Sequence, residues 1–325
     1  MQIFKHIHSY AAILLAGTVL AGCTKDTHAP KPTTPVTTTT PSGTGDMVLT
    51  PAGLMPKENV HFIEPGNELR VSDDGRLQKV ESATGKMLQD FGPVTVTQDP
   101  VHNVGSSRAF NEIVPAAVNG WAAYTYWSNP TQTKPVTSYT TKWIVPAAPK
   151  TEGAQTIFLF NGMQDGETES SYIIQPVLQW GSSAAGGGKY WAITNWYVSS
   201  ASAFYGTLAT VTAGTSLTGV MTETGKTGSN YNYSSVFTGY PEATSITASN
   251  VPEAYWLAET LEVYSVTKAA QYPDATSMAF SGIDILEGTT NPSITWTPVA
   301  ATGKALPKAV VTSGSSSNGT VTIDF

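Results

Sequence analysis

Cysteine and histidine are scarce in this 325-residue sequence, and their scarcity limits the chemistry it can perform. The single cysteine, Cys23, cannot form an intramolecular disulfide. None of the five histidines lies after His102. The rest of the chain therefore lacks the groups for Ser-His-Asp catalysis, Cys-His catalysis and histidine-based zinc sites. A catalytic site there must use carboxylates, amides, hydroxyls or aromatic groups.

Charged residues are also scarce, at 13 % of the sequence, which is about half of the usual share. The formal net charge is −7, whereas nucleic-acid binding requires a basic face for the phosphates. We therefore expect no nucleic-acid partner. Gly, Thr, Ser and aromatic residues replace the missing charges, which is typical of extracytoplasmic all-β proteins.

The first 22 residues have the form of a cleavable export signal. Lys5 supplies the positive charge, and the apolar stretch over residues 11–20 is shorter than the roughly 20 residues that span a bilayer. Leu20-Ala21-Gly22-Cys23 resembles the lipobox of bacterial lipoproteins, which implies cleavage before Cys23 and lipid on its thiol. The alternative is a plain secretory signal with an incidental cysteine. We predict a signal peptide over 1–22 and a lipid-anchored protein of the cell envelope, at the outer membrane and facing the cell surface.

The region between the signal and the main domain divides into two parts. Residues 23–46 are rich in Thr and Pro and have too few apolar side chains to form a core, so we expect an extended tether. Residues 47–105 contain no Trp and have Gly/Pro turns between short apolar runs. This pattern predicts a small β segment, with strands at Val60–Ile63, Leu69–Val71 and Val94–Val96. The alternative is that these strands belong to one larger domain.

Residues 106–325 are predicted to form an all-β domain. Segments with strand chemistry follow one another at short spacing, with glycine-rich turns and no helical alternation between them. This pattern favours a sandwich of antiparallel sheets. The expected strands are Thr140–Val145, Thr156–Phe160, Tyr172–Trp180, Tyr190–Val198, Ser216–Thr222, Tyr255–Tyr264 and Thr320–Phe325.

Aromatic and amide side chains share the faces of several expected strands. Gln175 and Gln179 point to one side of their strand, and Trp191 and Asn195 share a side of the next. Such a mixture suits sugars or extended peptides, although aromatic side chains also form sandwich cores. The glutamines carry more weight, because a buried amide needs hydrogen-bond partners.

The acidic residues Asp165, Glu167 and Glu169 alternate along one short segment. Their oxygens could converge on a calcium ion if the loop curls suitably, while a solvated acidic loop is the alternative. No EF-hand pattern is present. We expect neither a bound metal nor a cofactor.

Several segments between residues 143 and 280 resemble, in order, motifs of the glutamic peptidases called eqolisins. Phe158-Leu159-Phe160-Asn161-Gly162 resembles the family's Trp-Val-Gly-Ile-Asp-Gly strand. Ile173-Ile174-Gln175 is similar to its Ile-Leu-Gln, whose glutamine belongs to the catalytic pair. Ala254-Tyr255-Trp256-Leu257-Ala258-Glu259 is similar to Ala-Glu-Trp-Ile-Val-Glu. The resemblance implies a concanavalin A-like or eqolisin-like antiparallel β-sandwich with hydrolase activity.

Three acids of the eqolisin site are neutral in this sequence. Tyr255 stands at the position of the catalytic glutamate, and Asn161 and Asn195 stand where the family has Asp and Glu. Gln175 is retained. The candidate catalytic residues are therefore Gln175 with Glu259 or, more weakly, Glu253 as a substitute base. The candidate substrate-binding residues are Gln179, Trp191, Asn195, Tyr255, Trp256 and Asn161.

The sequence is compatible with two functions. The first is a surface hydrolase that acts on an extracellular peptide or polysaccharide through carboxylate and amide groups. The second is a module that binds such a polymer without cleaving it, because its catalytic acids have been replaced. Both place the polymer and the membrane, through the lipid anchor, among the partners, and neither fixes an oligomeric state.

Overall fold

The computed structural model describes residues 46–98, 117–130, 134–300 and 307–325. The predicted signal peptide, Cys23 and almost all of the tether lie outside the described residues, as do His102 and the boundary near residue 105. The described residues all belong to one compact unit. None of the helices in the described ranges has the length and apolar character that crossing a membrane requires.

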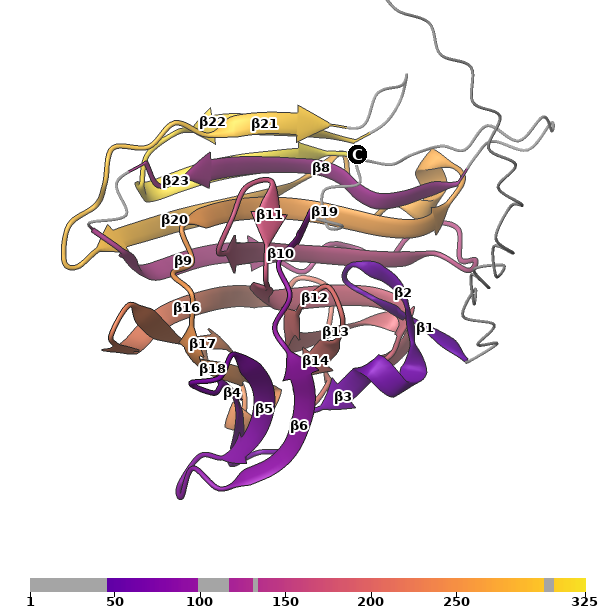
Figure 1. Ribbon diagram of the computed structural model, residues 1–325. Helices are drawn as coiled ribbons and strands as arrows, with labels where there is room; N and C mark the ends of the chain where they lie inside the picture. The colour runs from indigo at the N-terminus through magenta and orange to yellow at the C-terminus, as the bar shows by residue number, and fades with distance from the viewer. Residues whose placement is uncertain (1–45, 99–116, 131–133, 301–306) are drawn as a thin grey trace, which may run out of the picture. The chain divides into compact units, whose positions relative to one another are not determined.

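Two large sheets contain most of the described strands (Figure 1). Sheet I has the order β21 (Thr297–Ala300), β8 (Val118–Ser128), β19 (Trp256–Val266), β10 (Thr156–Gln164), β12 (Ile173–Ser183), β13 (Gly186–Val198), β14 (Ala203–Tyr205) and β3 (Val60–Phe62), with β15 (Ala209–Thr210) also paired to β13. Sheet II has the order β22 (Lys308–Ser313), β23 (Ser317–Asp324), β20 (Ser277–Glu287), β9 (Val136–Ile144), β16 (Ser216–Thr227), β17 (Asn230–Phe237), β18 (Ile246–Val251), β4 (Asn67–Val71), β5 (Arg76–Glu81) and β6 (Met87–Pro93).

The remaining described elements are short. Two small sheets pair β1 (Met47–Thr50) with β2 (Gly53–Pro56) and β7 (Thr97–Gln98) with β11 (Glu169–Ser170). Single 3-10 turns occur at η1 (Lys57–Asn59), η2 (Glu242–Thr244) and η3 (Ala269–Gln271).

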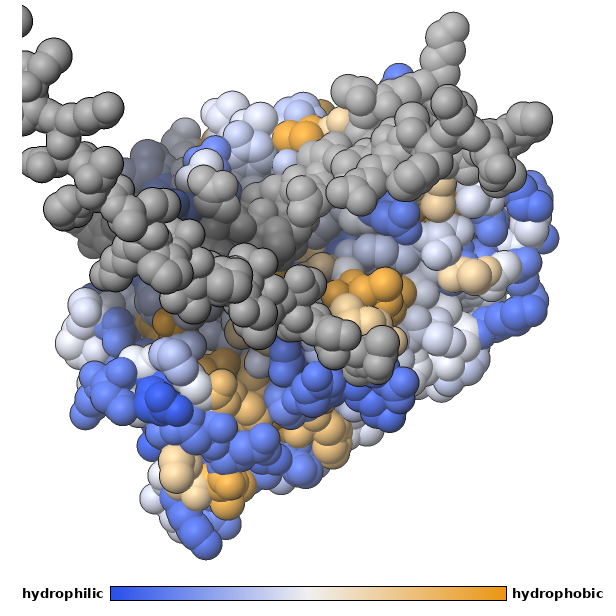
Figure 2. All heavy atoms as spheres, turned by 45° about the vertical axis from the view of Figure 1, so that its right-hand side comes forward, coloured by the Kyte–Doolittle hydropathy of each residue, from blue (hydrophilic) through white to orange (hydrophobic). Residues whose placement is uncertain are grey.

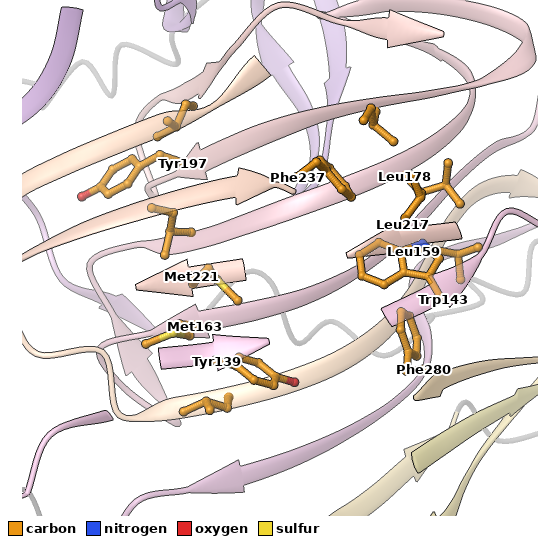
Figure 3. Close-up of a cluster of buried hydrophobic side chains, with 14 of the residues drawn as sticks. Tyr139, Trp143, Leu159, Met163, Leu178, Tyr197, Leu217, Met221, Phe237 and Phe280 are labelled. Carbon is orange, nitrogen blue, oxygen red and sulfur yellow. The ribbon is translucent and has the colours of Figure 1, made fainter. Parts of the chain in front are cut away.

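The main core lies between the two sheets, where each strand turns alternate side chains inward. Figure 3 shows part of it: Tyr139, Trp143, Leu217, Met221, Phe237 and Phe280 from sheet II pack with Leu159, Met163, Leu178 and Tyr197 from sheet I. All of these side chains are buried. The predicted all-β antiparallel sandwich is therefore confirmed.

All seven strands expected in the main domain are observed. They are β9, β10, β12, β13, β16, β19 and β23, which coincide with the predicted segments to within a few residues, and several run longer than predicted. The sequence did not mark β8, β17, β18, β20 or β22 as strands. The strand expected at Val94–Val96 is not formed, because the residues between β6 and β7 are irregular.

The N-terminal strands join the two large sheets. β3 pairs with β14, and β4 pairs with β18; these are two parallel pairings between the N-terminal and C-terminal parts of the described chain. β4, β5 and β6 then form an antiparallel meander that extends sheet II. Figure 2 shows orange apolar areas between blue polar ones in the lower half of the molecule, at the height where Figure 1 places β3–β6. Phe62, Met87 and Leu88 are exposed apolar side chains of this region.

A second apolar cluster lies on the other face of sheet I, here called the outer face. Trp121, Phe158, Phe160, Trp196 and Trp256 are its large buried side chains. Met55 of the β1–β2 hairpin belongs to the same cluster, with Leu49 and Ala52 packed against it. The Ala184 amide donates to the Leu49 carbonyl at 2.8 Å, which ties the hairpin to the turn between β12 and β13.

Candidate functional site

Glu259 points from β19 into the core between the sheets. Its Oε1 accepts hydrogen bonds from the Tyr139 hydroxyl, at 2.8 Å, and from the Thr141 hydroxyl, at 2.5 Å. Burial raises the pKa of Glu259 to about 8, against the smaller lowering effect of these two bonds. Asn161 lies directly opposite on β10, and neither its amide nor Glu259 Oε2 has a hydrogen-bond partner among the described residues. Glu259 is thus a buried acid that is mostly protonated at neutral pH.

Gln175 points to the opposite side of sheet I. Ile173 and Val177 lie two residues before and after it on β12, so their side chains point to the same face, and both belong to the outer-face cluster. The side chain of Gln175 is 1 % exposed, and neither its Oε1 nor its Nε2 has a hydrogen-bond partner among the described residues. Its cross-strand neighbour Trp196 has a buried indole N–H that is unpartnered in the same way.

The sheet therefore separates the two residues of the expected dyad. Gln175 lies on the outer face, whereas Glu259 lies on the inner face with Leu257 and Leu261. Side chains alternate between faces along each strand, so Gln175 and Glu259 cannot act on one bond in this fold. The proposed pairing of Gln175 with Glu259 is thus corrected by the register of β10, β12 and β19.

Glu262 is the buried carboxyl that shares the outer face with Gln175. It accepts a hydrogen bond from the Tyr264 hydroxyl, and burial raises its pKa to about 8. The register places Gln175 beside Gly162, which pairs with Ala258, four residues before Glu262. Two strand spacings and four residue steps put the Cα atoms of Gln175 and Glu262 roughly 16 Å apart. This separation is too long for an amide and a carboxyl to act on the same bond.

Unpartnered polar atoms recur along the outer face. Besides Gln175 and Trp196, the Thr260 hydroxyl and Glu262 Oε2 are buried without a hydrogen-bond partner in the described ranges. Phe160 pairs with Thr260, and Phe158 pairs with Glu262, so aromatic rings separate these polar groups. Buried polar groups in native proteins are almost always satisfied, and each exception requires an explanation.

The predicted substrate-binding residues are divided between the two faces. Asn161, Trp191 and Asn195 face the core between the sheets, where Asn195 Nδ2 donates to the Thr244 carbonyl at 2.7 Å and Oδ1 accepts from Ser235 at 2.7 Å. The bond with Ser235 of β17 links sheet I to sheet II, and the bond with Thr244 links sheet I to the 3-10 turn η2.

Gln179 and Trp256 lie on the outer face, and Tyr255 is half-buried just before β19. Gln179 Nε2 donates to the carbonyls of Gly181, at 2.7 Å, and Gly186, at 2.9 Å. These bonds hold the β12–β13 hairpin, where Gly181 and Gly187 adopt positive φ angles. Gln179 thus has a structural role that its sequence position alone did not reveal.

Glu253 lies in the loop before β19. Burial raises its pKa, against the smaller lowering effects of a hydrogen bond with Tyr231 and of the positive charge of Lys226, both on sheet II. Lys226 Nζ in turn donates to the Tyr231 hydroxyl at 2.8 Å. Gln175 makes no hydrogen bond with Glu253, so this weaker candidate base forms no hydrogen-bonded pair with the expected glutamine.

The segment considered for calcium is organised by hydrogen bonds instead. Asp165 accepts hydrogen bonds from the hydroxyl groups of Ser170 and Ser171 and from the Ser171 amide. Glu169 lies in β11, paired with Gln98. No group of three or more His, Cys, Asp or Glu side chains in the described ranges could hold a metal ion.

The comparisons with known proteins yield distant structural likenesses. No known protein-family pattern and no curated protein matches the chain. Among solved structures, scytalido-glutamic peptidase with a peptide-based transition-state analogue is similar at 13 % identity and a TM-score of 0.42, over 63 % of this chain and 98 % of that one. SCP-B, a member of the eqolisin family of peptidases in complex with the tripeptide Ala-Ile-His, is similar at 13 % identity and a TM-score of 0.40, over 63 % and 97 %. Likeness at this level supports no conclusion about activity.

Proposed function

We propose that this protein binds an extended extracellular polymer, a peptide or a polysaccharide, on the outer face of sheet I and does not cleave it. One observation carries the proposal: Gln175, Trp196, Thr260 and Glu262 present unpartnered polar atoms on one face, among aromatic rings. A polymer with a hydrogen-bonding group in every unit supplies the missing partners. The aromatic rings between these atoms suit the apolar faces of sugars or peptide side chains.

Binding fits the arrangement better than hydrolysis. A hydrolase that uses a carboxylate and an amide needs both groups within reach of one bond. Neither Glu259 nor Glu262 meets this condition with Gln175. Glu259 lies on the other face, and Glu262 lies roughly 16 Å from Gln175 by the strand spacing. The neutral residues Tyr255, Asn161 and Asn195, which replace the acids of the resembling family, agree with a site without a catalytic base.

Access to this face requires movement, because its polar groups are buried. The β1–β2 hairpin covers part of the cluster through Leu49, Ala52 and Met55, and it belongs to neither large sheet. Displacement of this hairpin exposes apolar surface on the outer face. We therefore expect the opening of the hairpin to limit the rate at which the polymer binds. Binding should be slower than it would be at a preformed, open site.

Incubation of the full-length chain with denatured protein and a polysaccharide panel at pH 3 to 8 tests the proposal. Retention on one polymer without release of products is expected. Gln175→Leu should abolish retention, whereas Gln89→Leu, which removes an exposed amide from β6, should not. Product release that is lost in Glu262→Gln or Gln175→Leu would establish a hydrolase and overturn the binding-only function.

We also propose that lipid on Cys23 anchors the protein at the outer membrane, with the Thr/Pro-rich residues 24–45 as its spacer. The lipobox-like Leu20-Ala21-Gly22-Cys23 and the absence of any other cysteine support this proposal. A lipid chain contributes about 0.8 kcal/mol per buried CH₂, so several chains hold a protein firmly. Radiolabelled fatty acid should be incorporated by the wild-type chain and not by Cys23→Ser, which should also leave the membrane fraction. Equal labelling of both chains would refute the anchor.

A further inference from the structure

A polar groove of about 520 Å³ lies on the solvent face of sheet II. Its lining includes one side chain from each of five neighbouring strands: Thr224 of β16, Asn232 of β17, Ser249 of β18, Arg70 of β4 and Gln78 of β5. Four strand spacings give this row a length of about 19 Å. The row crosses from the C-terminal strands into the N-terminal meander, so the groove exists only because β4 joins sheet II.

Strand alternation explains why the groove is polar. In β4, Leu69 and Val71 point into the core, whereas Arg70 lies on the solvent side. In β17, Tyr231 and Tyr233 belong to the core, and Asn232 between them faces the groove. No aromatic side chain lines the groove in the described ranges.

Two β-bulges interrupt the strands at the groove. The pairing of β16 with β17 shifts between Glu223 and Gly225, and that of β17 with β18 shifts between Tyr231 and Tyr233. Thr224 is the extra residue of the first bulge, and in the second Ser249 and Asn250 of β18 lie opposite Asn232 alone. All four residues line the groove. Bulges re-aim side chains and are over-represented next to functional sites, so the groove has locally specified geometry.

Asn250 holds a left-handed backbone conformation at the same place, with φ +58°. Its amide N–H donates to Asn232 Oδ1 at 2.8 Å, and its Nδ2 donates to the Val71 carbonyl at 2.6 Å. Asn230 Nδ2 donates to its Oδ1 at 3.1 Å. Residues in sparsely populated backbone regions persist where the surroundings fix them, and they concentrate at ligand sites.

Hydrogen bonds hold two charged side chains of the groove, Arg70 and Glu68, in place. Arg70 Nη2 donates to Glu68 Oε1 at 2.8 Å, and Arg70 Nε donates to the Ser249 hydroxyl at 3.3 Å. The Ser249 hydroxyl also donates to Glu68 Oε1 at 3.0 Å. A guanidinium that is fixed in this way loses little conformational entropy when it binds a ligand.

From these observations we infer that the groove binds a neutral glycan, at a site separate from the outer face of sheet I. Two carboxylates, Glu68 and Asp73, accompany the single guanidinium of Arg70, which disfavours a polyanion. The five strands are paired side by side, so a peptide finds no free strand edge to extend and no apolar pocket for its side chains. Hydroxyl, amide and guanidinium groups in a row match a chain that carries hydroxyl groups on every unit.

Affinity electrophoresis of the full-length chain through gels that contain neutral polysaccharides (a β-glucan, a mannan and a xylan) tests this inference. We expect one of them to retard the wild-type protein. Arg70→Ala and Asn232→Ala should each weaken the retardation at least 10-fold in apparent affinity. Thr312→Ala, which removes an exposed hydroxyl elsewhere on sheet II, should leave it unchanged.

Thermal unfolding of each variant separates loss of the ligand from loss of the fold. A Thr224→Ala variant provides a second probe, because its side chain is exposed and its removal should leave the fold intact. Unchanged retardation in the folded Arg70→Ala and Asn232→Ala variants would refute the inference, as would retardation by none of the neutral polysaccharides. Gln175→Leu should retain the retardation, so failure of the outer-face site and failure of this groove give different results.

Discussion

Two buried glutamates should make this protein's stability depend on pH. Glu259 and Glu262 each have a pKa of about 8 because burial disfavours their charged form. Their ordinary value is 4.5. Between pH 4.5 and about 8, the folded chain holds protons that the unfolded chain has released. The free energy of unfolding therefore falls as the pH rises through this window, by about 1.4 kcal/mol per pH unit for each carboxyl.

Glu259→Gln should remove one of these two contributions. The Gln side chain can keep the acceptor that binds Tyr139 and Thr141, and it does not titrate. We expect the slope of the unfolding free energy against pH, between pH 5 and 7.5, to become shallower by about 1.4 kcal/mol per unit. Urea unfolding at several pH values measures this slope. An unchanged slope would show that Glu259 is ionised in the folded state.

The buried amide of Gln175 should lower the free energy of unfolding of the ligand-free protein. Its amide is buried and has no hydrogen-bond partner among the described residues, so the folded chain loses the hydration of these atoms without replacement. Gln175→Leu should raise the free energy of unfolding by about 1–3 kcal/mol while abolishing polymer binding. Chemical denaturation measures the gain. A destabilised variant would mean that the amide is satisfied by a partner within the fold.

The composition of a segment predicts some strands of this protein, but it does not show which face of the sheet a side chain occupies. Tyr-, Trp- and Ile-rich runs at residues 173–180 and 190–198 predicted β12 and β13, because their side chains suit a sheet surface. β18 and β20 contain Ser, Asn, Gly and Asp and lack that composition; their neighbours in sheet II stabilise them. The sequence around Gln175 or Glu259 does not indicate on which face of sheet I its side chain lies. Only the pairing of β10 with β12 and β19 fixes it.

The β1–β2 hairpin should control access to the outer face of sheet I. Met55 is a buried residue of this hairpin and belongs to the same apolar cluster as Trp121 and Trp256. Met55→Ala should loosen the hairpin and raise the association rate with the polymer several-fold, because opening precedes binding. Stopped-flow or surface-based kinetics measure this rate. The exposed hairpin residue Leu54 provides the control, since Leu54→Ala should leave the rate unchanged.

At the scale of the whole molecule, the N-terminal strands are structural parts of the sandwich. The sequence predicted their β character and left open whether they form a separate segment, because neither composition nor turn pattern reports a parallel pairing over more than a hundred residues. β4 pairs with β18 across about this interval, and Leu69 of β4 is fully buried in the main core. The polar groove on sheet II follows from the same pairing.

Leu69→Ala should therefore destabilise the entire sandwich. Removal of a buried leucine side chain costs about 2–5 kcal/mol. All eight Trp lie at residue 121 or later, so tryptophan fluorescence reports the unfolding of the C-terminal part alone. If the N-terminal strands and the sandwich unfold as one cooperative unit, this signal shifts to lower denaturant by the full cost of the substitution. Leu88→Ala, at an exposed position of the same meander, should shift it by less than about 0.5 kcal/mol. An unchanged fluorescence transition in Leu69→Ala would show that β4–β6 unfold independently, and the groove that they complete would then open without loss of the sandwich.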